Sequence, residues 1–120
     1  MATIAQMAGF AGAMAHHLGV AAMTAGDLDR AEAHLRQAAD QHHHLRAPGW
    51  EARSRLLLAE VLLRRDGAAL PVARELVNRA AELVEGHDVP EVRRELERVS
   101  QMTAGGGAAI PTDPALASLN

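Results

Sequence analysis

The stretch from Trp50 to Arg65, W-E-A-R-S-R-L-L-L-A-E-V-L-L-R-R, decides the fold of this chain. Its apolar residues cover most of the circumference of a helix, far more than the roughly 100° stripe of a surface helix. Such a helix must be packed on several sides, so we expect it at the centre of the protein. One polar stripe remains, because Arg53, Glu60 and Arg64 fall within about 40° of one another. We expect this stripe to be exposed and available to a partner.

The composition predicts a helical core that contains few aromatic side chains. The chain of 120 residues has one Phe, one Trp and no Tyr. The core must therefore consist of Leu, Val, Ala and Met, which favours close packing of helices. Cysteine is absent, which excludes disulfides and thiolate metal ligands.

The charge pattern excludes two classes of partner. The net charge is −3, and acidic and basic residues alternate along the helices, so no basic face is available for direct nucleic-acid binding. No apolar run approaches the ~20 residues of a membrane span. The N-terminus lacks the basic region of a secretory signal. We therefore expect a cytoplasmic protein without a membrane partner.

Periodicity and stop signals divide the chain into helices. We predict a frayed or short leading segment over residues 1–10, a first firm helix over 11–25 and a second over 28–44. Gly26 should end the first in the left-handed conformation, and Asp27 should cap the second. After a break at Pro48 and the central helix, we predict a fourth helix over about 71–85. Gly86 should stop it.

The C-terminal part has the pattern of a cap followed by a tail. A fifth helix over about 90–102 carries a narrow apolar stripe on a charged surface, which is typical of a terminal capping helix. From Thr103 onward, a G-G-G run and two prolines predict a flexible tail over 103–120. The predicted domain is thus residues 11–102.

An internal repeat relates the first two helix pairs. Leu18, Gly19 and Ala22 correspond to Leu58, Ala59 and Leu62, at an offset of 40 residues (58 − 18). The second helices of the pairs match at an offset of 42 (73 − 31), with two residues inserted near 68–70. The matched residues there are Ala31, Leu35 and Ala38 in the first pair and Ala73, Val77 and Ala80 in the second.

This pattern, with G-D-L-D-R-A-E between the helices of the first pair, resembles the tetratricopeptide repeat. The resemblance implies an all-α solenoid of two helix hairpins plus a C-terminal capping helix. The phrases A-H-H-L-G and L-R-A-P-G-W-E-A-R-S-R-L-L-L-A also resemble the C-terminal helical repeats of large bacterial ATP-binding regulators of the LuxR-like and adenylate-cyclase-associated kind. This chain has no G-x-x-x-x-G-K-[ST] motif, so only a scaffold role, as a piece of a transcriptional regulator, carries over.

The resemblance also implies a groove lined by the first helix of each pair. An Arg pair on such a groove suits a carboxylate, since the guanidinium fork binds it bidentately. The alternative is that Arg53 and Arg64 only form solvated ion pairs with Glu60, worth about 0–1 kcal/mol each. The predicted groove residues are His16, Val20, Met23, Arg53, Leu56, Glu60, Leu63 and Arg64.

The seven histidines invite a metal-site interpretation. Consecutive residues on a helix point about 100° apart, so His42, His43 and His44 cannot all bind one ion, and no H-E-x-x-H spacing occurs. We expect these three to end the second helix, where the helix dipole favours a cationic imidazole. No nucleophile, base and orienting group come together in the sequence. We therefore expect no enzyme activity, no cofactor and no metal.

The sequence thus predicts a module that binds a protein or peptide partner in its groove. The apolar first helix, with Met14, Leu18 and Phe10, should also mediate self-association or docking. Two alternatives stay open. A small-molecule or nucleotide sensor would need a closed pocket, and a histidine-based metal binder would gain stability with Zn²⁺.

Overall fold

The part of the chain that the structure describes consists of five α-helices with their connections and contains no strand. The computed structural model describes the backbone of residues 4–108 and the side chains of residues 11–104. The helices are α1 (Ile4–Ala25), α2 (Leu28–His44), α3 (Pro48–Arg65), α4 (Leu70–Val84) and α5 (Pro90–Ala108). A 3-10 turn, η1 (Gly67–Ala69), lies between α3 and α4, where the repeat carries its two extra residues. The predicted all-α class is confirmed.

The boundaries of the inner helices follow the local signals in the sequence. Gly26 and Gly86 both have a φ of 82°, the left-handed conformation that ends a helix. The Asp27 side chain accepts a hydrogen bond of 3.2 Å from the backbone N–H of Arg30, which satisfies one donor of the first turn of α2. These ends are where the sequence predicts them.

The two outer helices are longer than the sequence predicts. α1 begins at Ile4 instead of Ala11, and α5 continues to Ala108 instead of Met102. A glycine inside a helix costs about 1 kcal/mol, but each added residue of an existing helix gains a hydrogen bond. Residues 103–108 are therefore helix and not the start of a tail. Residues 1–3, and the part of the expected tail from 109 to 120, lie outside the described residues.

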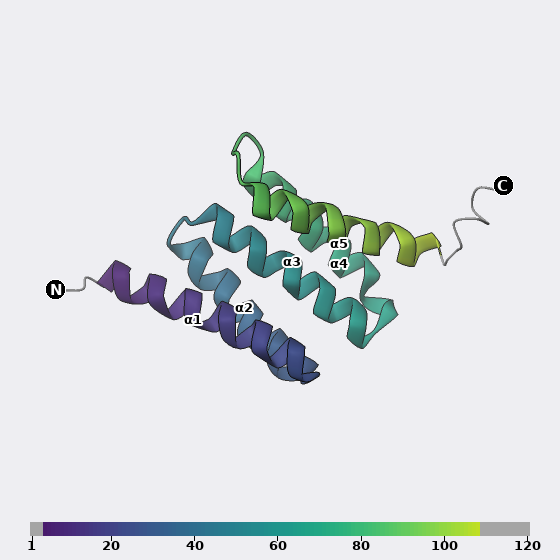
Figure 1. Cartoon of the computed structure of the whole chain (residues 1–120), viewed down its shortest axis with the longest axis horizontal. Helices are drawn as coiled ribbons and strands as arrows, with labels where there is room; N and C mark the ends of the chain where they lie inside the picture. The colour runs from purple at the N-terminus through teal and green to yellow at the C-terminus, as the bar shows by residue number, and fades with distance from the viewer. Residues whose placement is uncertain (1–3, 109–120) are drawn as a thin grey trace.

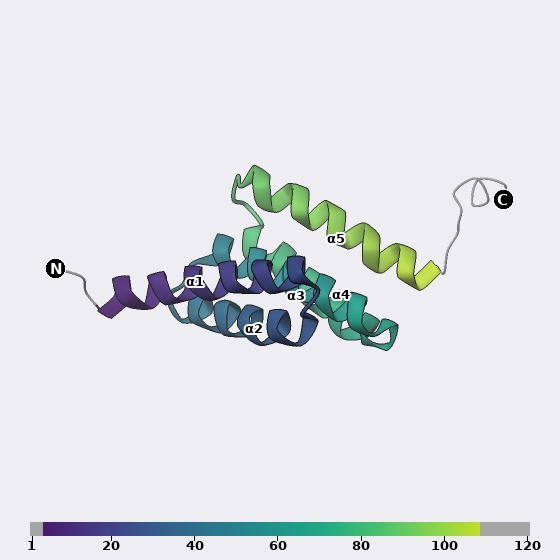
Figure 2. The same ribbon diagram turned by 60° about the horizontal axis from the view of Figure 1, so that its bottom comes forward.

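Helix α3 lies in the middle of the molecule. α1 pairs with α2 and α3 with α4, while α2 packs against α3 and connects the two pairs (Figure 1). α5 packs on α3 and α4, on the outer side of the second pair (Figure 2). α1 also contacts α3. The central helix is thus covered by all four others, as its apolar circumference predicts.

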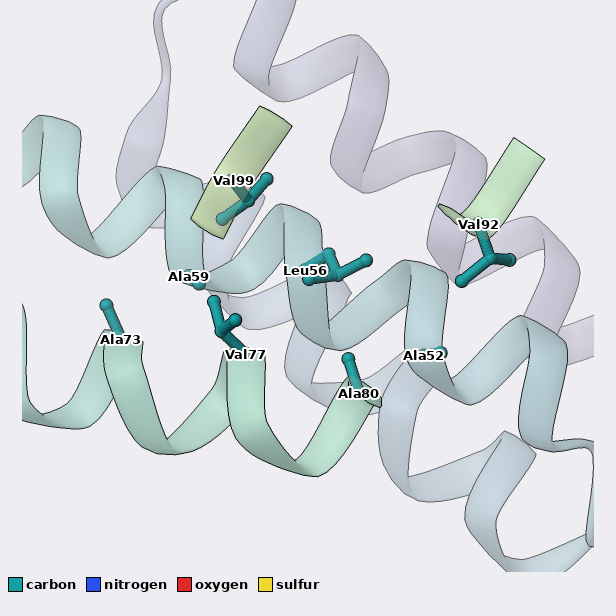
Figure 3. Close-up of a cluster of buried hydrophobic side chains, with 8 residues drawn as sticks. All are labelled: Ala52, Leu56, Ala59, Ala73, Val77, Ala80, Val92 and Val99. Carbon is teal, nitrogen blue, oxygen red and sulfur yellow. The ribbon is translucent and has the colours of Figure 1, made fainter. Parts of the chain in front are cut away.

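Two hydrophobic clusters share α3. The first joins α3 to α4 and α5, and Figure 3 shows Leu56 at its centre between Val92 and Val99 of α5. The second joins α3 to α2, and its buried residues are Ala31, Leu35, Leu58, Val61 and Leu62. α3 therefore uses opposite faces to hold the two halves of the protein together.

Glycine residues allow α1 to lie close to α2. A Cβ added at Gly19 would lie 2.6 Å from Cγ of Leu35, and one added at Gly12 would lie 2.7 Å from Nε2 of His42. Leu35 and His42 are both buried, so neither can move aside freely. These two positions require glycine because of space and not because of backbone conformation.

We predict opposite effects for two Gly→Ala substitutions. Gly19→Ala should destabilise the protein by about 1–3 kcal/mol, because the clash with Leu35 outweighs the better helix propensity of alanine. Gly49→Ala is the control, since a Cβ there meets nothing within 4 Å, and it should stabilise by about 0.5–1 kcal/mol. Urea unfolding measures both values. A stabilising Gly19→Ala would contradict the close packing of α1 on α2.

Candidate functional site

Helices α1, α3 and α5 border a groove made of two adjoining pockets. Both pockets include Val20 of α1 and Leu57 of α3, so they form one continuous surface, which we call the α1–α3–α5 groove. One end is lined in addition by His16, Arg53, Glu91, Arg94 and Glu95. The other end is lined by Met23, Thr24, Glu60, Arg64 and Arg98.

Six of the eight residues predicted for the groove line it, and two do not. Leu56 is fully buried in the cluster with α4 and α5, and Leu63 packs against the same cluster. Their assignment to the groove was wrong, because each points toward α4 and α5 instead of α1. Leu57 lies on the groove instead. It follows Arg53 by one helical turn, so the Arg53 stripe itself could have indicated it.

The contribution of α5 to the groove was also missed. Glu91, Arg94, Glu95 and Arg98 all line it. The narrow apolar stripe of α5 on a charged surface predicted only a capping helix, and that stripe gives no sign of a groove. The position of α5 beside α3 makes it the third helix along this surface.

Glu60 is buried, which corrects the expectation that it forms part of an exposed stripe. Its side chain accepts hydrogen bonds of 2.7 Å from both Arg64 of the same helix and Arg98 of α5. Only 4% of the residue is exposed. Its hydrogen bond, with that of Glu95, raises the pKa of Arg98 above its ordinary value, so this arginine is always charged. Glu60 thus fastens α5 onto α3.

Arg53 and Arg94, at the other end of the groove, are not paired with a carboxylate of the described residues in the way that Arg64 and Arg98 are. Arg53 stands over the ring of Trp50, with its guanidinium carbon 4.9 Å from the ring centroid, a favourable cation–π arrangement. Arg94 is exposed on α5. Among the described residues, neither arginine has a carboxylate within salt-bridge distance. Their charges are therefore available to a ligand.

A cluster of rings lies directly behind this end of the groove. Trp50 packs edge-on against His16 at 5.3 Å and is stacked with His42 at 5.2 Å between centroids. Nδ1 of His16 is hydrogen-bonded to Oγ of Ser54 at 2.9 Å. Burial, with a smaller contribution from Arg53, lowers the pKa of His16 to about 4. Burial also lowers the pKa of His42. Both rings are neutral at pH 7.

The three consecutive histidines at the end of α2 point in different directions. His42 is buried against Trp50, and Nδ1 of His43 lies 3.3 Å from Oε1 of Glu51. Nδ1 of His44 lies 2.8 Å from the carbonyl oxygen of Asp40. They do end α2, as predicted. Within the described residues, no three His, Asp or Glu side chains are placed to hold a metal ion together.

The chain matched no protein-family model, no curated protein and no solved structure. Among the described residues, no helix combines the length and the apolar character that crossing a bilayer requires.

We predict that Glu60 is needed to hold α5 in place. Glu60→Ala leaves Arg98 without its buried partner, and it should destabilise the protein by about 1–2 kcal/mol, less than for a wholly buried pair because both arginines are half exposed. Amide hydrogen exchange should increase most in α5. Glu82→Ala removes an exposed pair with Arg79 and should change stability by less than about 0.5 kcal/mol. Equal effects of both variants would refute the role of Glu60.

Proposed function

We propose that the chain is a tetratricopeptide-like solenoid that acts as a protein–protein interaction module. Two observations support this architecture. The six residues that the repeat matches in α2 and α4, from Ala31 to Ala80, are all buried, as a shared structural role requires. The alternate helices α1, α3 and α5 border one continuous groove, which is how stacked helix pairs create an extended binding surface.

The groove suits an extended or helical segment of a protein partner. Its middle is apolar, with the half-buried side chain of Leu57 beside Val20, and both of its ends carry charged side chains. Apolar anchors flanked by charges are what groove-binding peptides use. The groove is open along its length and touches three helices, which favours a chain segment over the enclosed small molecule of a sensor domain.

The charges favour a partner segment that carries an acidic group. Arg53 and Arg94 line the same pocket, and this pair replaces the pair of Arg53 and Arg64 expected from the sequence, because Arg64 is already bonded to Glu60. A carboxylate between two guanidinium groups receives charge-assisted hydrogen bonds. Glu91 borders the same pocket and limits how many acidic groups it accepts.

The regulatory setting rests on the resemblance alone. The likeness to the helical repeats of LuxR-like regulators suggests that this module belongs to a bacterial transcriptional regulator in the cytoplasm. In such a setting the groove would bind another protein, and any effect on DNA would come through that partner. The single observation that carries the interaction role is the continuous groove of α1, α3 and α5.

A second surface on α1 favours self-association. Leu18 is 46% exposed, whereas its repeat counterpart Leu58 is buried against α2. Met14 on the same side of α1 is 45% exposed. The face that α3 uses to pack on the preceding helix pair is therefore open on α1. We propose that another copy of the chain covers it.

We predict that blocking the groove abolishes peptide binding. Phage-displayed random peptides of about 12 residues, a length that spans such grooves, are selected on the wild type, and their affinity is measured by fluorescence anisotropy. Val20→Asp removes an apolar contact from the groove and places a carboxylate where it competes with the peptide for Arg53 and Arg94, so it should weaken binding at least about tenfold. Val72→Asp on α4 is the matched control, since Val72 is similarly exposed, 46% against 38%. It should leave the affinity unchanged.

Substitution of Arg53 and Arg94 tests whether the groove prefers peptides that carry an acidic residue. Arg53→Gln and Arg94→Gln should reduce the enrichment of Asp and Glu among selected peptides, and Arg74→Gln on α4 should not. If no peptide binds the wild type, or if Val20→Asp and Val72→Asp act alike, the groove is not the interaction site.

Self-association has its own test. Sedimentation velocity at tens of micromolar, a range in which weak dimers form, should show a concentration-dependent species for the wild type. Leu18→Glu should remove that species because it puts a charge into the apolar contact. A monodisperse wild-type monomer would exclude this role of α1.

A further inference from the structure

The contact between α1 and α3 contains ionisable rings in place of the apolar side chains found elsewhere in the core. His16 is 1% exposed and His42 is 2% exposed, and both pack against Trp50 of α3. The hydrogen bond between His16 and Ser54 joins α1 directly to α3. Because this bond and the ring contacts attach α1 to the centre of the molecule, the charge state of the two rings bears on that attachment.

The site accommodates uncharged rings. The ring of His42 fits against Gly12, where an added Cβ would lie 2.7 Å from Nε2, and its Nδ1 is buried with no hydrogen-bond partner among the described residues. A proton on that nitrogen would be a buried donor without an acceptor, which is costly. Ser54 Oγ can also accept a hydrogen bond from a protonated Nδ1 of His16, so the cost of a charge on this ring comes from its burial and not from loss of the bond.

The groups around His16 do not stabilise a positive charge on its ring. On α1 its neighbour is His17, on α2 it is His42, and on α3 it is Arg53, and all three disfavour a positive His16. From α5, the side chains of Glu91, Arg94 and Glu95 line the same pocket as His16. Two of these three are acidic, but Glu95 is already paired with Arg98 at 2.8 Å.

One carboxylate faces His42, and it is already engaged. Glu51 of α3 favours a charged His42, but its side chain is bonded to Arg55 at 2.7 Å and to His43 at 3.3 Å. The pKa of His42 is lowered in spite of Glu51, since burial is the larger effect. His42 therefore has no free acidic partner. Glu91, the one unpaired carboxylate in the pocket of His16, forms no hydrogen bond or ion pair with that ring among the described residues.

We propose that this cluster, His16 and His42 around Trp50, is a pH-sensitive latch that holds α1 on α3 at neutral pH and releases it in mild acid. Release removes Val20 and Met23, the α1 wall of the groove, so partner binding weakens at the same time. This last consequence rests on the proposed function of the groove, whereas the latch itself does not.

The direction of the pH effect follows from the difference in the pKa of His16 between the released state of α1, where the ring is exposed, and the attached state, where it is buried. A solvent-exposed imidazole titrates near 6.5, and burial lowers the pKa of His16 to about 4. The released state therefore binds more protons between these values. Attachment of α1 is complete above about pH 6.5 and weakens progressively as the pH falls toward 4. At pH 5 the attachment equilibrium should fall on the order of tenfold or more.

Hydrogen exchange measures this release directly. After correction for the intrinsic effect of pH on exchange, protection of the α1 amides in residues 11–25 should fall about tenfold between pH 7.5 and pH 5. Protection of α4 should not change. The chain has one tryptophan, so the fluorescence of Trp50 should report the same transition. Equal protection of α1 at both pH values would overturn the latch.

Variants identify the responsible rings. His16→Gln, His42→Gln and the double variant cannot be protonated, so their α1 protection should depend much less on pH. His87→Gln in the α4–α5 connection, where the ring is exposed, should behave as the wild type. If the first three variants do not fold, an NMR titration of the wild-type rings decides instead. A His16 pKa near 6.5 would overturn the proposal, and one below about 5 would support it.

Peptide binding at the two pH values separates the latch from the groove. The selected peptides should bind more weakly at pH 5, in proportion to the fall in the attached fraction of α1, and the His16→Gln, His42→Gln variant should lose less affinity. If α1 is released at pH 5 but no peptide binds the groove at pH 7.5, the latch stands and the proposed function fails. If α1 stays protected and peptides bind equally at both pH values, the groove stands and the latch fails.

Discussion

The burial of α3 is the constraint on which the rest of this structure depends. Its side chains are apolar around most of the circumference, so water must be excluded from most of its surface. The four other helices do this, with α2 on one face and α4 and α5 on another. Both hydrophobic clusters contain residues of α3. The protein is therefore a set of amphipathic helices assembled around one that cannot be exposed.

The few polar side chains of α3 that are buried each point to a different neighbour. Glu51 is hydrogen-bonded to His43 of α2, Ser54 to His16 of α1, and Glu60 to Arg98 of α5. Apolar contacts alone tolerate sliding and rotation of one helix on another, whereas a buried hydrogen bond is satisfied in one arrangement only. These three contacts orient the outer helices, and they place α1 and α5 on either side of the same groove.

The groove and the ring cluster share residues, which links binding to the attachment of α1. Arg53 borders the groove, is held over Trp50 and disfavours a proton on His16. An acidic partner bound at Arg53 would offset part of that repulsion. The same arginine thus connects the charge of a ligand to the charge state of the rings behind it, so the groove and the latch cannot be altered independently at this position.

The sequence by itself determined the all-α class, the ends of the inner helices and the central place of α3. Such features depend on local signals, namely the spacing of apolar residues, Gly26 and Gly86 in the left-handed conformation, and the Asp27 cap. The tertiary structure decided which helices cover each side of α3, and so placed Leu57 on the groove and Leu56, about 100° away on the helix, in the core. It also decided that Glu60 is buried and that His16 meets Ser54. The contact of Glu60 with Arg98 and that of His16 with Ser54 each join residues 38 positions apart in the chain. Such contacts depend on the angle at which two helices pack, which no single residue determines.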